Sequence, residues 1–296
     1  MLTRIISGAV GVVLLGAVLF FHDTIVLPIA VAAIIAVMLF ELLRAVKLHK
    51  CLPVLFAAEV AGISVPLIYY ASRCDRAILD NTEAGIQGDP VFYSANVAEV
   101  NHMILFAFVL LAAFVIFVTW LKKHKEIRYE QVFFVLAVMI LVPQAMTTML
   151  RIERFDSKSG LFLLIMGLCG AWIADTGAYF TGVAIGKHKL CPEISPKKTI
   201  EGLAGGILTT AVVYTAAFSV YYGFTARRAV IAFVTGAVCA VIGTVGDLSA
   251  SMVKRQIGFK DYGKIMPGHG GLMDRFDSVL FVLPTYYVFI ALFGVQ

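Results

Sequence analysis

The chain has 296 residues, of which 60% are hydrophobic and only 15% are charged, and its formal net charge is +5 at pH 7. A soluble domain of this length cannot bury so much apolar surface, so the composition excludes an ordinary soluble globular protein. The positive charge reflects a bias of cations toward one membrane face, where anionic lipid head groups and substrates lie, and it gives no indication of a nucleic-acid partner.

Nine apolar runs of about spanning length follow one another along the chain. They cover residues 5–21, 25–46, 52–72, 103–121, 131–150, 160–185, 202–222, 228–246 and 278–294. A helix needs about 20 apolar residues to cross the hydrocarbon core, and within one segment only a helix satisfies its own backbone polar groups there. The sequence therefore predicts an all-α, polytopic integral membrane protein with about nine transmembrane helices. The first run is short enough for a signal peptide, but eight spans follow it, and we interpret it as a retained helix.

The domain organisation and the orientation follow from the same pattern. We treat residues 1–296 as a single membrane domain, with N-terminal spans in 1–150 and the motif-bearing spans in 160–296. If the N-terminus is cytoplasmic, 17 of the 24 Lys and Arg residues lie on the cytoplasmic side. This asymmetry satisfies the positive-inside rule, so we expect a protein of the plasma (inner) membrane whose active site faces the cytoplasm. The longest outer loop, about 73–102, is acidic and is predicted to be solvated, with little fixed structure.

Three polar residues share one helix face at the end of the eighth apolar run. Asp247, Ser251 and Lys254 are spaced i, i+4 and i+7, a spacing that stacks side chains along one face. A carboxylate, a hydroxyl and an ammonium in this order can hold a metal ion and a phosphate together. The alternative is an intramembrane salt bridge or a hydrogen-bonded polar face. We favour a functional role, because ionisable groups inside spans are costly.

The loop after this span is rich in glycine and cations. In Pro267-Gly-His269-Gly270-Gly271, the glycines allow positive φ and can present N–H groups to an anion. Lys260 can add charge to such a segment, although loop lysines are often only solvated. His269 is compatible with a general base, a phosphate contact or a helix cap, and we favour a phosphate or structural role.

Two carboxylates open the last span. Asp274 and Asp277 are one helical turn apart and flank Arg275. They are plausible partners for Asp247 around one or two cations. Acids in a first helical turn also complement the helix dipole, which is the simpler alternative. Dipole compensation alone does not account for the whole constellation.

Polar residues also occur in and after the sixth span. Asp175 lies in the middle of this span among closely spaced glycines, which favour tight helix packing. It is either a third acid of the site or the partner of a lysine on the motif helices. In the following loop, Lys197 and Lys198 can grip a triphosphate or a lipid phosphate, and Thr199 can cap the helix that follows. A basic patch that touches only lipid is an equally good interpretation of the two lysines.

The run from Ser251 to Asp277 resembles the signature of the phosphatidate cytidylyltransferase (CDP-diacylglycerol synthase) family over its whole length. The segments 175–179 and 195–202 resemble other motifs of the same family. The specific likeness covers about 170–277, whereas the first half agrees mainly in hydrophobicity.

The resemblance implies a reaction in which CTP and phosphatidic acid give CDP-diacylglycerol and pyrophosphate. It implies an all-helical membrane domain, often dimeric, with a polar cavity open to the cytoplasm and to lipid. Asp247 and Asp274 match metal-binding acids, with Mg²⁺ expected and a second, monovalent cation compatible with the site. The residues assigned to catalysis are Ser251, Lys254, Arg255, Asp277, Lys260 and His269. Those assigned to substrate binding are Lys197, Lys198, Arg275, Gly270, Gly271 and Asp175.

Three alternatives stay open at this point. The first is another CTP-using membrane enzyme, either a polyprenol- or phytol-type kinase or a cytidylyltransferase for a different lipid phosphate. The second is a transporter or channel, for which buried acids are natural. The polar residues cluster toward one face and show no inverted repeat, which disfavours transport. A purely structural membrane protein has no use for the motif and is the weakest alternative.

Overall fold

The computed structural model describes the backbone of residues 2–82, 90–268 and 270–294, and their side chains except in 2–5, 73–82 and 90–99. The described chain is almost entirely helical, with one short hairpin. Its helices are α1 (Leu2–Phe20), α2 (Val26–Ala45), α3 (Leu52–Thr82), α4 (Pro90–Lys122), α5 (Tyr129–Glu153), α6 (Gly160–Ile185), α7 (Ile200–Tyr222), α8 (Ala226–Ile257), α9 (Met273–Phe276) and α10 (Val279–Phe293). The strands β1 (Lys189–Cys191) and β2 (Ser195–Thr199) form an antiparallel pair between α6 and α7.

The predicted membrane architecture is confirmed. Within the described residues, eight helical segments are long and apolar enough to cross a membrane, and the first predicted span, 5–21, corresponds to a shorter apolar helix, Ile6–Phe20. The last spanning segment, Met273–Phe293, combines α9 with α10.

One loop prediction is wrong. The acidic segment 73–102 is expected to have little fixed structure, but α3 continues to Thr82 and α4 begins at Pro90, while 83–89 lie outside the described residues. Residues 73–82 contain neither glycine nor proline, so nothing in them stops a helix that is already nucleated in the apolar run. Proline suits the first helical position, because its missing N–H has no helical partner there.

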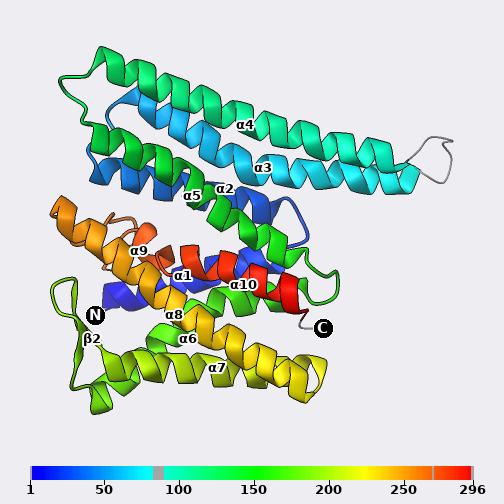
Figure 1. Cartoon of the computed structure of the whole chain (residues 1–296), viewed down its shortest axis with the longest axis vertical. Helices are drawn as coiled ribbons and strands as arrows, with labels where there is room; N and C mark the ends of the chain where they lie inside the picture. The colour runs from blue at the N-terminus through cyan, green and yellow to red at the C-terminus, as the bar shows by residue number, and fades with distance from the viewer. Residues whose placement is uncertain (1, 83–89, 269, 295–296) are drawn as a thin grey trace. The chain divides into compact units, whose positions relative to one another are not determined.

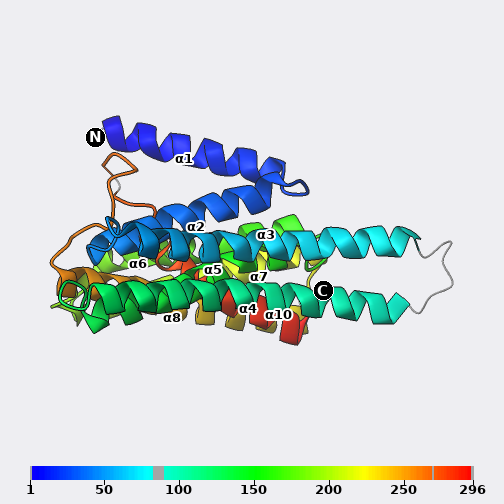
Figure 2. The same cartoon turned by 90° about the horizontal axis from the view of Figure 1, so that it is seen from above.

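The chain divides into two compact units, Met1–Leu150 and Arg151–Gln296. In the first unit, α3 packs against both α2 and α4, and both views show α3 and α4 running side by side (Figures 1 and 2). Its buried core is apolar, and Gln131 Nε2 donates a hydrogen bond of 2.6 Å to the carbonyl of Val46. The predicted site residues all belong to the second unit.

In the second unit, α7 packs between α6 and α8, and α10 packs on α8 and α6. Small residues bring α6 and α7 very close together. A Cβ atom on Gly206 would lie 2.7 Å from the carbonyl oxygen of Ala174, and one on Gly177 would lie 2.7 Å from the side chain of Thr209. The predicted role of the glycines around Asp175 is therefore confirmed, because they set the distance between the helix that carries this acid and its neighbour.

Substituting Gly206 by Ala is expected to destabilise the second unit. The new methyl group would collide with the backbone oxygen of Ala174, which cannot rotate away, and overpacking of this kind costs about 1–3 kcal/mol. A melting curve in detergent should shift down by several degrees. Gly16→Ala is the matched control, because nothing lies within 4 Å of a Cβ at that helical position. Equal melting temperatures for the two variants would contradict the prediction.

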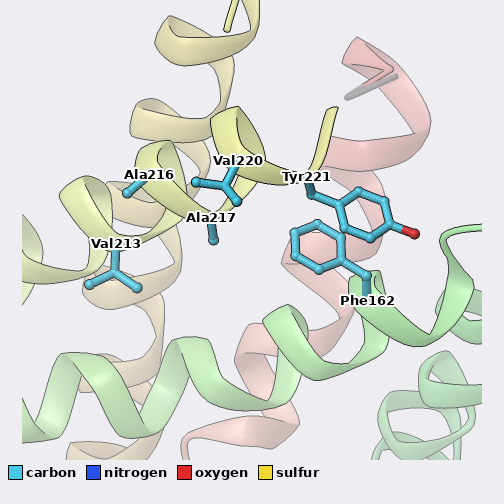
Figure 3. A pocket seen from close by; sticks show the side chains of 6 residues that line it. All are labelled: Phe162, Val213, Ala216, Ala217, Val220 and Tyr221. Atoms are coloured by element: carbon cyan, nitrogen blue, oxygen red, sulfur yellow. The ribbon is translucent and has the colours of Figure 1, made fainter. Parts of the chain in front are cut away.

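An apolar groove of about 610 Å³ lies between α6 and α7. Figure 3 shows the rings of Phe162 and Tyr221 stacked against each other, with centroids 4.1 Å apart, beside Val213 and Val220 of α7. Phe162 precedes Asp175 by 13 residues, or about 20 Å along the helix. The groove is therefore remote from the predicted polar site.

Candidate active site

The hairpin β1–β2 brings a lysine to the last third of α8. Thr199 is the N-cap of α7 and its Oγ1 accepts a hydrogen bond of 3.1 Å from the N–H of Gly202, which confirms the predicted cap. One residue earlier, Lys198 Nζ lies 2.6 Å from Asp247 Oδ2. The hairpin, the end of α8 and α9 occupy the same side of the second unit, at the left of Figure 1.

The polar face of α8 divides between two partners. Ser251 Oγ donates a hydrogen bond of 3.3 Å to Asp247 Oδ1, as expected from their i, i+4 spacing. Lys254 lies farther along the same helix, and its ammonium reaches Asp274 Oδ1 at 2.7 Å. Two lysine–carboxylate pairs, Lys198–Asp247 and Lys254–Asp274, are thus built at one end of the unit.

Asp274 is the anchor of the loop between α8 and α9. Its side chain is only 4% exposed, and Oδ2 accepts hydrogen bonds from the N–H groups of Tyr262 (2.8 Å) and Gly271 (2.9 Å). Gly270 has φ of 90°, a left-handed conformation that favours glycine. The N–H of Gly271 therefore binds an anion in this structure, namely the carboxylate of Asp274.

Tyr262 is a site residue that the sequence argument missed. Its hydroxyl donates a hydrogen bond of 3.0 Å to the carbonyl of Ala250, and Lys254 Nζ lies 5.4 Å from the centre of its ring. Burial, reinforced by the charges of Asp274 and Asp277, raises the pKa of the Tyr262 hydroxyl above its ordinary value. The hydroxyl stays protonated and acts as a hydrogen-bond donor. An aromatic residue within a cationic glycine-rich loop was the signal available in the sequence.

Two further carboxylates interact electrostatically with Asp247 of the Lys198–Asp247 pair. Asp175 of α6 interacts electrostatically with Asp247 and with the cations of Lys198 and Arg275. Asp277 is buried, interacts with Asp247, Asp175 and Lys254, and its Oδ1 accepts a 2.7 Å hydrogen bond from the N–H of the next residue. The predicted acids of α6, α8 and the segment after α9 therefore act on one another electrostatically.

Close backbone approach makes this interaction possible. A Cβ atom on Gly246 would lie 2.9 Å from the carbonyl oxygen of Asp277 and 2.8 Å from the ring of Phe281. Only a glycine allows α8 to come so near the start of α10. The adjacent residue, Asp247, is thereby held close to Asp277.

The donor set is chemically suited to a hard divalent cation, although no three of the described carboxylates of Asp175, Asp247, Asp274 and Asp277 have oxygens within 4.8 Å of one another. Carboxylate oxygens are the ligands that Mg²⁺ prefers, and several acids in one place repel one another unless a cation compensates them. Asp247 fits directly, since its two oxygens contact only one ammonium and one hydroxyl group among the interactions described. Asp274 is more constrained, because Lys254, Tyr262 and Gly271 already contact its oxygens. A cation there would share Oδ1 with the ammonium of Lys254 or replace it.

The remaining predicted residues are placed as follows. Four cationic side chains are exposed and therefore accessible to a ligand: Lys197, Arg255, Lys260 and Arg275. His269 lies outside the described residues.

The end of the second unit that holds the Lys198–Asp247 and Lys254–Asp274 pairs thus offers positive and negative groups beside membrane-spanning helices. Fixed ammonium groups can hold phosphate oxygens, arginines can contact them in bidentate fashion, and the carboxylates can hold a cation. Such a set suits a reaction between two phosphate-bearing molecules, where mutual repulsion is the main obstacle.

Comparisons with known proteins agree with this chemistry. The chain matches the profile of the Cytidylyltransferase family over residues 2–293. It is 36% identical over 203 residues to the phosphatidate cytidylyltransferase of Bacillus subtilis (strain 168), an alignment that covers 69% of this chain and 72% of that protein. It is 44% identical over 131 residues to the phosphatidate cytidylyltransferase of Staphylococcus aureus (strain COL), covering 44% of this chain and 50% of that protein. The chain therefore belongs to the cytidylyltransferase family, which confirms the resemblance seen in its motifs.

Proposed function

We propose that the protein is a CTP:phosphatidate cytidylyltransferase, which makes CDP-diacylglycerol and pyrophosphate in phospholipid biosynthesis. The family match supports cytidylyl transfer, and the names of the relatives support phosphatidic acid as the acceptor. The observation that carries the proposal is the pairing of Lys198 with Asp247 and of Lys254 with Asp274 at one end of a membrane-spanning helical unit.

The chemistry requires charge compensation more than proton transfer. An oxygen of the phosphatidate phosphate forms a bond to the α-phosphorus of CTP, and the bond from that phosphorus to the pyrophosphate group breaks. The attacking oxygen is already anionic near neutral pH, so little general-base assistance is needed. The difficulty is to bring one anion against another, which fixed cations relieve. Lys198 and Lys254 act as point charges, while Arg255 and Arg275 suit bidentate phosphate contacts.

We further propose that Asp247 and Asp274 hold Mg²⁺ and that Asp277 and Asp175 add negative charge to the site. The cation would neutralise charge on the triphosphate and its leaving pyrophosphate. Support comes from the oxygen-rich donor set and from the electrostatic interactions of Asp175 and Asp277 with Asp247. The family resemblance also supports a homodimer, which crosslinking in native membranes would test.

The proposed reaction is tested with labelled CTP and purified protein. With phosphatidic acid in mixed micelles, label from the α-phosphate should enter the lipid fraction, and label from the γ-phosphate should appear in pyrophosphate. Transfer of the γ-label to lipid would instead reveal a kinase and overturn the proposal. Chelation of divalent cations should abolish transfer, and added Mg²⁺ should restore it. Full activity in the presence of chelator would contradict the metal proposal alone.

We also propose that the protein lies in the plasma membrane with its site on the cytoplasmic face. The asymmetric distribution of lysine and arginine supports this orientation. In a cysteine-free background, Lys197→Cys should react with an impermeant maleimide only after the cytoplasmic face is exposed. Arg227→Cys, at the opposite end of the second unit, should react in intact cells. Both positions are exposed, so reactivity reports sidedness rather than burial. Labelling of both variants from the same side would overturn the orientation.

A further inference from the structure

The first turn of α7 carries an acid that binds the start of the hairpin. The carboxylate of Glu201 accepts the backbone N–H of His188, with distances of 3.3 Å to Oε1 and 3.2 Å to Oε2. The ring of the same histidine adds a contact, with Nδ1 lying 2.6 Å from Oε1. Glu201 is partly exposed, at 22%, whereas His188 is 74% exposed. One carboxylate thus satisfies both a backbone and a side-chain donor of the residue that precedes β1.

These contacts close the base of the hairpin. The N–H of Ile200 donates a hydrogen bond of 2.9 Å to the carbonyl of His188, so the residue before β1 is joined to the residue after β2. Between these points the strands pair only at Lys189 with Thr199 and at Cys191 with Ser195, with an irregularity between the two pairs. An isolated two-stranded hairpin is marginally stable at best. This hairpin is not isolated, because β2 also packs against α6 and α7, and the attachment of its base is one of the contacts that set its position.

The hairpin carries the lysine that reaches Asp247. Lys198 lies in β2, three residues before Glu201, and its flexible side chain extends to Asp247 Oδ2 at 2.6 Å. Both members of this pair are partly exposed, at 23% and 26%, so packing around the side chains does not hold them in place. The backbone of β2 must therefore set where the ammonium lies.

We infer that Glu201 is a positioning residue for the transfer reaction. Its hydrogen bonds to His188 hold the hairpin in the position that keeps the ammonium of Lys198 in contact with Asp247. The inference rests on the proposed function. Glu201 does not contact Lys198 and acts only through the hairpin backbone. The competing explanation is that an acid in the first turn of α7 merely complements the helix dipole. That role needs a negative charge, whereas the positioning role needs an acceptor oxygen at the N–H of His188.

A double-mutant cycle separates the two explanations. Glu201→Ala is expected to lower kcat/KM for CTP roughly 10- to 100-fold, because displacing a charge by about 1 Å is enough for such a loss. In the Lys198→Ala background, the same substitution should change kcat/KM by less than about 3-fold, because the residue through which Glu201 acts is already gone. A full, independent loss in both backgrounds would overturn the inference.

Two further variants test the mechanism. Glu193→Ala is the matched control, because it removes an exposed acid from the turn of the same hairpin, and its activity should stay within about 2-fold of the parent. Glu201→Gln keeps an acceptor oxygen but loses the charge, so positioning predicts substantial recovery relative to alanine. Dipole compensation predicts that glutamine is as poor as alanine, and that outcome would overturn the inference.

Hydrogen exchange supplies a readout that does not depend on activity. In Glu201→Ala, the amides of residues 189–199 should exchange faster than in the parent, while those of Glu193→Ala should not. Unchanged exchange in Glu201→Ala would overturn the inference even if the enzyme is active. If the parent protein transfers no cytidylyl group, the proposed function fails, and the exchange experiment still decides whether Glu201 holds the hairpin.

Discussion

Asp247→Asn is expected to reduce cytidylyl transfer about 10²–10³-fold or more while leaving the protein folded. The carboxylate lies at the centre of the site, 2.6 Å from Lys198 Nζ and 3.3 Å from Ser251 Oγ, and it interacts electrostatically with Asp175 and Asp277. Asparagine preserves the shape of the side chain and keeps an oxygen that can accept the hydrogen bond from Ser251. It removes the charge that would attract a cation and leaves the ammonium of Lys198 uncompensated. The measurement is transfer of α-label from CTP to lipid at saturating Mg²⁺, together with a melting curve.

The control for this substitution is Glu126→Gln, which removes the charge of a 72% exposed carboxylate in the first unit. It should leave both activity and melting temperature unchanged. Near-normal turnover of Asp247→Asn would remove Asp247 from the proposed metal site. A large fall in its melting temperature would show that the residue is mainly structural.

Asp274→Asn should behave differently, because its carboxylate also holds the loop. Its oxygens accept from Lys254, Tyr262 and Gly271, and an amide group must turn one N–H toward these donors. We therefore expect loss of activity and, in contrast to Asp247→Asn, a clear fall in melting temperature. Breaking a buried ion pair from one side costs about 3–5 kcal/mol. An unchanged melting temperature would contradict the anchoring role.

Substitution of Lys254 is also expected to lower cytidylyl transfer strongly. Lys254→Ala removes the partner of Asp274 and a cation of the site, and it should cost about 2–4 kcal/mol of transition-state stabilisation. Lys254→Arg should also be severely impaired, although it keeps the charge. The ammonium is confined between Asp274, at 2.7 Å, and the ring of Tyr262, at 5.4 Å, and a planar guanidinium is longer and differently shaped. Both variants are compared with the parent by kcat for CTP and by melting temperature.

Matched changes at Lys125, an exposed lysine of the first unit, supply the controls, and Lys125→Ala and Lys125→Arg should both behave like the parent. Parent-like activity of Lys254→Arg would show that only the charge matters and would move Lys254 out of the catalytic set. The double variant Lys254→Ala, Asp274→Asn should be less impaired than the product of the single effects, because each single change leaves a buried charge without its partner.

The sequence by itself determined the membrane fold and much of the local geometry of the site. Each apolar run of about 20 residues is long enough to cross the membrane as a helix, whose backbone N–H and C=O groups bond to one another in the absence of water. The i, i+4 spacing placed Ser251 beside Asp247, and the preference of threonine for N-caps placed Thr199 at the start of α7. These features depend on neighbours within about one helical turn, so the order of residues is enough to predict them. The continuation of α3 to Thr82 and the start of α4 at Pro90 were not predicted, because acidic side chains indicated a loop, yet residues 73–82 contain neither glycine nor proline.

Only the tertiary structure decided which charges pair. Lys254 shares a helix face with Asp247, yet its ammonium reaches Asp274, while Lys198 arrives at Asp247 from a hairpin whose existence the sequence did not predict. Tyr262 and Glu201 acquire their roles in the same way, through contacts that loop paths create. Helical periodicity in the sequence predicts the face of the helix on which a side chain lies, but it does not predict which other segment packs against that face. The approach depends on interhelical distances set by glycine contacts such as Gly206 with Ala174, and on loops whose course is decided by hydrogen bonds to buried carboxylates.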